Sequence, residues 1–193
     1  APNSPSASAT FYTVGIYNDG ILFRLAGALG TFKLNFKSGE LVTAEFEMWG
    51  AYVAPSDVAM RTTSLSGSAP APPPFLGAAA SVLGLTTPRF DTMSFDLGNS
   101  LIYRGDPNAS SGVLTALITG RKTNGGLDPE GVLVGTKNYW SEFLADTTGS
   151  LTTGTFPSTG TQYNKINLTM PKAKYRKVGL GDRNGLRTFP IEY

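Results

Sequence analysis

The chain contains no cysteine and no histidine among its 193 residues. These absences exclude disulfide bonds, thiolate nucleophiles, zinc sites of the usual composition and every catalytic triad that depends on imidazole. An enzyme built from this sequence would have to rely on paired carboxylates or on lysine or tyrosine chemistry. We therefore expect a protein without catalytic residues, metal ligands or a cofactor.

Charge and long apolar runs are also scarce. Charged residues make up 16% of the chain, well below the usual quarter of a soluble protein, which favours a protein packed against copies of itself. The net charge of +2 is too small to indicate the basic face of a nucleic-acid-binding protein. No apolar run approaches the roughly 20 residues of a membrane-spanning helix, so no membrane partner is expected.

The most regular stretch, residues 30–53, predicts a β-hairpin. Apolar and polar residues alternate in both arms, and a period of two places each series on one face of a strand. Ser38, Gly39 and Glu40 between the arms let the chain reverse. The apolar face, expected to face the core, carries Phe32, Leu34, Phe36, Ala44, Phe46 and Met48. The outward face carries Lys33, Asn35, Lys37, Glu45 and Glu47, whose opposite charges can pair across the strands.

The remaining sequence also reads mainly as strands. Residues 10–17 and 21–29 predict a hairpin around Asn18, Asp19 and Gly20, followed by a bulge or corner at Gly27 and Gly30. Further strands are predicted within 90–104, with a turn at Gly98, within 113–122, and after residue 149, while residues 123–126 read as a turn. The class is therefore mainly β, an antiparallel β-sandwich or barrel with one flanking helix and long hairpin and loop arms. Its length favours a single domain over residues 1–193.

One segment predicts a helix, over residues 136–145. Thr136 or Asn138 can serve as the N-cap, and Gly149 lies beyond the end. So short a helix is marginal alone and must be stabilised by docking onto a sheet. The residues predicted to dock are Tyr139, Trp140, Phe143 and Leu144.

Two stretches predict arms, residues 1–9 and the proline-rich loop 54–75. A loop of this length in a compact domain is either a flexible surface loop or an arm that becomes ordered against a neighbouring subunit. The inter-subunit candidates are Pro55, Pro70, Pro72, Pro73, Pro74 and Phe75. Residues 75–85 are compatible with either a short helix or an irregular apolar segment.

Two charged constellations invite a functional interpretation. Glu45 and Glu47 share a strand face, but a glycosidase pair is disfavoured because lysines lie opposite and no aromatic sugar platform is recognisable. Lys172, Lys174 and Arg176 form a row, which is more typical of a charged sheet edge than of a phosphate site.

Four segments, taken in order, carry a resemblance to a known family. They are residues 15–57, 90–104 (FDTMSFDLGNSLIYR), 117–125 (LITGRKTNG) and 136–151 (TKNYWSEFLADTTGSL). They resemble the tail tube proteins, or major tail proteins, of tailed bacteriophages. The resemblance implies a β-sandwich or barrel flanked by a helix, six-membered rings that stack into a hollow tube, and double-stranded DNA that passes through it during ejection without specific binding.

The resemblance also implies partners and a location. The partners are further copies of the chain and other tail proteins, namely a terminator, a tape measure and a baseplate or tip protein. The location is the virion tail, assembled in the cytoplasm of the host bacterium. Family members often carry a further portion before the strand equivalent to residues 10–17, so a fragment or processed form is expected.

A DNA duct must not bind phosphates tightly, so its lining needs acidic groups beside basic ones. The lumen-facing candidates are therefore Glu45, Glu47, Lys33 and Lys37. Two other classes remain open, namely a non-catalytic β-sandwich module that binds carbohydrate or a receptor on a virion or cell surface, and a small glycoside-cleaving enzyme.

Overall fold

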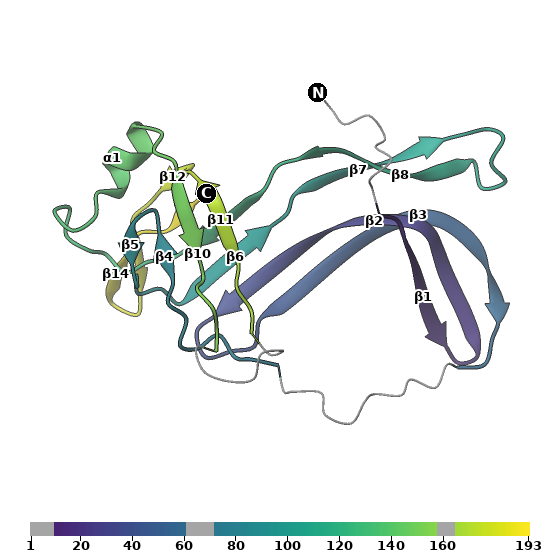
Figure 1. Ribbon diagram of the computed structural model, residues 1–193, viewed down its shortest axis with the longest axis horizontal. Coiled ribbons are helices and arrows are strands. Elements are labelled where there is room, and N and C mark those ends of the chain that lie inside the picture. The colour runs from purple at the N-terminus through teal and green to yellow at the C-terminus, as the bar shows by residue number, and fades with distance from the viewer. Residues whose placement is uncertain (1–9, 61–71, 158–164) are drawn as a thin grey trace. The chain divides into compact units, whose positions relative to one another are not determined.

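The computed structural model describes residues 10–60, 72–157 and 165–193. Its elements are strands in antiparallel sheets and one short helix, which confirms the predicted mainly β class (Figure 1). The predicted arm at residues 1–9 and Pro70 of the proline-rich loop lie outside the described residues.

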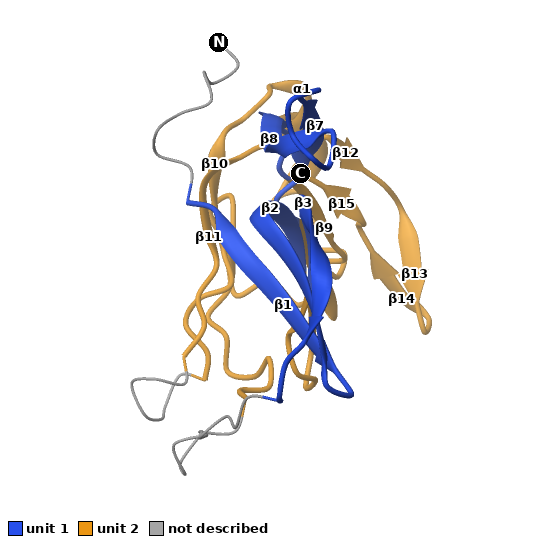
Figure 2. Cartoon of the chain, turned by 90° about the vertical axis from the view of Figure 1, so that its right-hand side faces the viewer, with its two compact units in different colours: residues 1–33, 45–68, 96–123 blue, residues 34–44, 69–95, 124–193 orange. Residues whose placement is uncertain are grey.

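The chain divides into two compact units (Figure 2). The first unit comprises residues 1–33, 45–68 and 96–123, and the second comprises residues 34–44, 69–95 and 124–193. Strands β2, β3 and β6 have residues in both. The units are described separately, and a single domain stays a prediction.

The first unit begins with the hairpin of β1 (Tyr12–Asn18) and β2 (Ile21–Lys37). Asp19 and Gly20 form its two-residue turn, both with positive φ, 45° and 83°, which confirms the predicted turn. The register shifts between Tyr12 and Val14, opposite Gly27, whose φ is +60°. Glycine tolerates this conformation, so the predicted irregularity is a bulge within one continuous strand.

The central hairpin continues from β2 into β3 (Thr43–Asp57), which pairs with β2. The backbones approach closely at two glycines. A Cβ on Gly30 would lie 2.5 Å from the Glu47 carbonyl oxygen, and one on Gly50 would lie 2.9 Å from that of Ala26. The strand includes Pro55, so the prediction that a loop begins at residue 54 is wrong, because proline is compatible with a strand where its missing N–H is not needed.

A separate two-stranded sheet completes the first unit. It pairs β7 (Asn99–Gly105) with β8 (Val113–Arg121). Gly98 separates β6 (Thr92–Asp96) from β7 as expected, yet the two strands belong to different sheets, so Gly98 is not a hairpin turn. Instead its backbone accepts the Lys122 N–H at 2.9 Å, and a Cβ there would lie 2.0 Å from the Lys122 carbonyl oxygen.

In the second unit, β6 is followed across the sheet by β9 (Asn124–Leu127), β15 (Ile191–Glu192) and β12 (Lys177–Val178). Residues 124–126 are strand, so the turn predicted over 123–126 is wrong. The glycine is used here for close approach, because a Cβ on Gly125 would lie 2.2 Å from the Ser94 carbonyl oxygen and 2.7 Å from the Tyr193 ring. The Gly125 N–H donates to the Tyr193 carbonyl oxygen at 3.1 Å.

Two smaller sheets belong to the second unit. One has the order β11 (Thr169–Ala173), β10 (Gly149–Thr152), β4 (Ser81–Val82) and β5 (Leu85–Thr86). Residues 75–88 therefore hold two short strands joined at Leu83 and Gly84, and no helix. The other sheet pairs β13 (Gly181–Arg183) with β14 (Leu186–Thr188).

The helix α1 (Tyr139–Leu144) is shorter than the predicted 136–145. Asn138 is its N-cap, and its side-chain oxygen accepts the Ser141 N–H at 2.9 Å. Within the part of the chain that the structure describes, no helix is long and apolar enough to cross a membrane.

The core of the second unit contains a cluster of aromatic rings. Phe36 lies with its ring centroid 5.4 Å from that of Phe75 and 6.3 Å from that of Phe156. Phe75 in turn lies 6.0 Å from Phe90. Such tilted and edge-to-face contacts stabilise a core beyond the area that they bury.

Candidate functional site

The two units bury very different amounts of apolar side chain. Among the described residues of the first unit, the buried hydrophobic side chains are Leu22, Ala28, Leu29 and Ala116, and two of these are alanines. The second unit buries sixteen of its described hydrophobic residues, from Phe36 to Tyr193. The second unit thus has a core of its own, whereas the strands of the first unit are mostly uncovered.

Large apolar side chains stand open on β1, β2 and β3, and we call this set the open strand surface. Phe46 is 70% exposed although its ring lies 6.0 Å from that of Phe32 on the same hairpin. The expectation that the whole apolar face points to the core is therefore correct for Phe36, which is 1% exposed, and wrong for Phe46. Sequence periodicity identifies a shared face but not what covers it. The open strand surface consists of Tyr12, Ile16, Ile21, Phe23, Phe46 and Tyr52.

The outer strands of this region also have free edges. Among the strands that the structure describes, β1 and β3 each pair with β2 alone. Residues Thr43 to Glu47 of β3 are all exposed, so both faces of this strand end are open. A strand with an open edge and two open faces is a template for pairing with another chain.

Three of the four lumen-facing candidates, Lys33, Glu45 and Glu47, belong to the first unit. Lys33 lies 3.7 Å from Asp96, a partner that the sequence did not indicate because it comes from a distant strand. Glu45 and Glu47 are both exposed on β3, and the Glu47 carboxylate accepts the Trp49 indole N–H at 2.8 Å. Lys33 is thus paired with an acid, and two further acidic side chains, Glu45 and Glu47, are exposed on β3.

Trp49 belongs to an aromatic pair that the sequence also did not reveal. Its ring stacks on that of Tyr103, with centroids 5.0 Å apart. Tyr103 is still 49% exposed. The stack joins β3 to β7 within the first unit.

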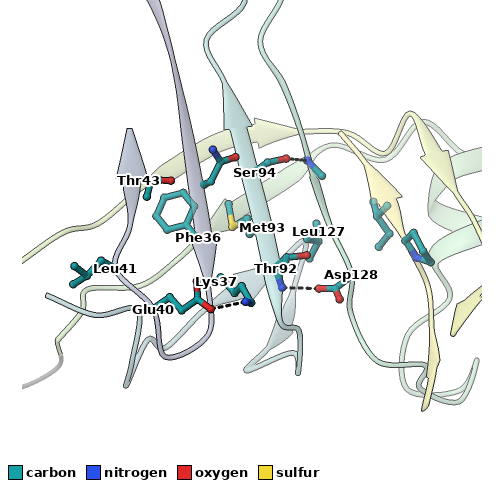
Figure 3. A pocket seen from close by; sticks show the side chains of 14 residues that line it. Phe36, Lys37, Glu40, Leu41, Thr43, Thr92, Met93, Ser94, Leu127 and Asp128 are labelled. Atoms are coloured by element: carbon teal, nitrogen blue, oxygen red, sulfur yellow. Dashed lines mark hydrogen bonds and ion pairs between the residues drawn. The ribbon is translucent and has the colours of Figure 1, made fainter. Parts of the chain in front are cut away.

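The fourth candidate, Lys37, lies in the second unit beside a hollow of about 520 Å³. Lys37 forms an ion pair with Glu40, so its charge is compensated (Figure 3). Hydrogen bonds line the far side, where the Asp128 carboxylate accepts the Thr92 N–H at 2.8 Å and Ser94 accepts the Gly126 N–H at 3.1 Å (Figure 3). The hollow has one compensated cation and otherwise neutral or acidic groups, so it has no unpaired basic charge for a phosphate.

Asp128 also belongs to an ion-pair network. Arg183 donates to the Asp128 carboxylate at 2.7 Å and to the Glu130 carboxylate at 2.9 Å. All three side chains are mostly buried, with exposed fractions of 23% to 29%. The Asp128 hydrogen bond and the coulombic field of both carboxylates raise the pKa of Arg183, so its guanidinium stays charged within the network.

The proline-rich candidates have different environments. Pro55 and Pro72 are exposed, whereas Pro73 and Phe75 are buried and Pro74 is half-buried. Phe75 is part of the aromatic cluster of the second unit, so its ring is not accessible to a neighbour in this structure. Only Pro55 and Pro72 remain as exposed inter-subunit candidates among the described residues.

The predicted docking face of the helix is only partly buried. Tyr139 is fully buried, and Trp140 packs edge-on against Phe189 with centroids 4.8 Å apart. Phe143 is 39% and Leu144 82% exposed, so the predicted docking of these two residues is wrong. A helix of six residues makes less than two turns, so it has little length over which to repeat a buried position.

The predicted basic row alternates with buried residues. Lys172, Lys174 and Arg176 are exposed, while Ala173 and Tyr175 between them are buried. Lys174 forms an ion pair with Asp146, so its positive charge is compensated and it is a weaker ligand for phosphate. No group of three or more acidic side chains within the described ranges is placed to hold a metal ion.

A comparison with known proteins identifies the family of the chain. The family model described as phage tail tube protein matches residues 2–173, and no curated protein matches the chain. The chain therefore belongs to the phage tail tube protein family, and it is a structural, non-catalytic protein of the virion tail.

Proposed function

We propose that this phage tail tube protein assembles into six-membered rings, and that the rings stack into the hollow tube through which DNA leaves the virion. The observation that carries the proposal is the open strand surface of the first unit. A folded chain that leaves several aromatic and β-branched side chains uncovered on adjacent strands is typical of a protein that buries them against a partner.

Self-pairing suits these strands because they offer backbone as well as side-chain contacts. Among the described strands, the outer edges of β1 and β3 have no strand partner, so they can accept another strand. A second copy supplies the matching edge in every ring, so that an inner wall of continuous sheet closes around the axis and no edge remains open.

The charges on the first-unit part of the central hairpin suit a lining for DNA. Asp96 compensates Lys33, and Glu45 and Glu47 add two negative charges. Such a surface repels phosphates weakly and releases no counterions to hold DNA. We therefore assign Glu45 and Glu47 to the lumen, with Lys33 beside them and Lys37 compensated by Glu40.

The remaining partners follow the same scheme. Pro55 and Pro72 of the proline-rich segment are exposed, and we assign this segment to contacts between neighbouring subunits. Other tail proteins then contact the tube. A terminator binds one end, a tape measure protein lies inside, and a tip or baseplate protein binds the other end.

Electron microscopy of the purified full chain tests the proposal. Six-fold rings or tubes are expected, and their abundance should rise with concentration. Phe46→Ser should abolish them, whereas the control variant Leu144→Ser, which changes an even more exposed apolar residue on α1, should leave them intact. Monomers at every concentration, or tubes formed equally well by Phe46→Ser, would overturn the proposal.

A further inference from the structure

A polar cluster lies beneath α1 in the second unit. Lys137, only 8% exposed, donates to the Leu83 carbonyl oxygen at 2.5 Å and to the Glu142 carboxylate at 2.6 Å. The ion pair balances the charge of the cluster. A buried pair of this kind is stable only when its remaining hydrogen-bonding atoms are also satisfied.

Three buried oxygen atoms in this cluster have no hydrogen-bond partner among the described residues. They are the hydroxyl oxygens of Tyr139 and Tyr175 and the second carboxylate oxygen, Oε2, of Glu142. Tyr139 is 0% and Tyr175 4% exposed, so bulk solvent does not reach either phenol. Leaving such an atom unpaired is energetically costly, so native proteins rarely do so.

Tyr139 and Glu142 are three residues apart on α1, so their side chains are neighbours on the helix surface. The two tyrosine rings meet at a centroid distance of 5.7 Å and an angle of 66°. Burial raises the pKa of Tyr139 to about 12, and the negative charge of Glu142 raises it as well. Burial and the same carboxylate also raise the pKa of Tyr175, so Glu142 acts on both phenols.

The chemistry of the three atoms defines what fits between them. Each neutral phenol offers one proton, and the carboxylate oxygen accepts one. The complement must therefore accept two hydrogen bonds and donate at least one. Lys137 already supplies the positive charge that Glu142 requires, which disfavours a cation, and Glu142 disfavours an anion.

We propose that an ordered internal water molecule is bound beneath α1, where it accepts hydrogen bonds from the Tyr139 and Tyr175 hydroxyls and donates one to Glu142 Oε2. Three hydrogen bonds are what an internal water typically makes. The water links Tyr139 and Glu142 of the helix to Tyr175, which lies between β11 and β12. It thus fastens a helix too short to be stable alone.

A high-resolution structure of the full chain, in rings or as a monomer, tests the inference. Water density in hydrogen-bond reach of all three oxygens is expected. In Tyr175→Phe the water should be lost or should retain two partners, while in Tyr193→Phe it should remain, because the Tyr193 hydroxyl donates directly to the Ser94 carbonyl oxygen at 2.7 Å.

Proton NMR supplies a second measurement on the soluble chain. The Tyr139 and Tyr175 hydroxyl protons should show cross-relaxation with a long-lived water, and Tyr175→Phe should remove the Tyr175 signal and weaken that of Tyr139. A structure in which either phenol donates directly to Glu142 Oε2 with no water between them would overturn the inference. So would hydroxyl signals that show no contact with water.

Discussion

Phe36 and Phe46 occupy equivalent positions in the sequence pattern of the central hairpin, yet the structure buries one and exposes the other. We expect their alanine variants to differ in kind. Phe36→Ala should lower the stability of the isolated chain and leave its assembly surface intact. Phe46→Ala should leave stability nearly unchanged and weaken assembly.

The magnitudes follow from burial. Phe36 is 1% exposed and contacts Phe75 and Phe156, so truncation should cost about 3 to 5 kcal/mol. In a chain of this size each kcal/mol lowers the melting temperature by roughly 2 to 4 °C, so a decrease of roughly 6 to 20 °C is expected. Phe46 is 70% exposed, and the small buried remainder of its ring limits the cost to roughly 1 kcal/mol.

The expected effect on assembly depends on the exposed part of the Phe46 ring. About 70% of a phenylalanine side chain is roughly 140 Å², and burying it between subunits stabilises the contact by up to roughly 3.5 kcal/mol per subunit. Since each 1.4 kcal/mol is about a factor of ten, Phe46→Ala should raise the critical concentration for assembly by up to roughly 300-fold.

Thermal melting at a concentration below the assembly threshold and light scattering across a concentration series measure the two effects. The reasoning is refuted if Phe36→Ala melts within roughly 2 °C of the parent chain, because that ring would then not be part of a packed core. It is equally refuted if Phe46→Ala destabilises the monomer as strongly as Phe36→Ala. Unchanged assembly of Phe46→Ala would refute the assignment of the open strand surface to the subunit interface.

Three further outcomes are expected. The free energy of unfolding should fall as the pH rises from about 10 toward 12, because burial raises the pKa of Tyr139 to about 12 and also raises those of Tyr175 and Tyr193; denaturant titrations should show a smaller fall for Tyr175→Phe. Gly98→Ala should lower the melting temperature more than Gly39→Ala, since both have positive φ but only the Cβ at Gly98 overlaps the Lys122 backbone; equal shifts would contradict that contact. Arg183→Met should cost about 1 to 3 kcal/mol in denaturant unfolding, against roughly 0.5 for Lys177→Met in an exposed pair, and equal costs would show that partial burial adds nothing.

Local features of the fold were predictable where a few neighbouring residues decide the backbone. Asp19 and Gly20 fix a hairpin turn, and Gly27 fixes a bulge, because few other residues adopt positive φ so readily. Asn138 caps α1 through its own side chain. In each case the cause lies within about four residues of the effect.

Features that depend on distant strands were not predictable. The sequence predicts turns at both Gly98 and Gly125, since glycine is frequent in turns. In the structure each allows a distant backbone or ring to approach, that of Lys122 and of Tyr193 respectively. Sequence shows that a side chain is missing there, but only the topology shows what occupies the space.

The two units differ in how they bury apolar side chains, and this difference explains why a chain with so few charges leaves so many apolar residues exposed. The aromatic cluster and the Arg183 network make the second unit self-sufficient, because their partners all belong to it. The first unit has no comparable core among its described residues, and charges on its strands would have to be desolvated on assembly at a cost that apolar groups avoid. Free strand edges invite incorrect pairing, but register is fixed where Gly27 forms a bulge and where Gly30 and Gly50 permit only close-fitting neighbours. The same surface can therefore remain open in the monomer and still select one register against a second copy.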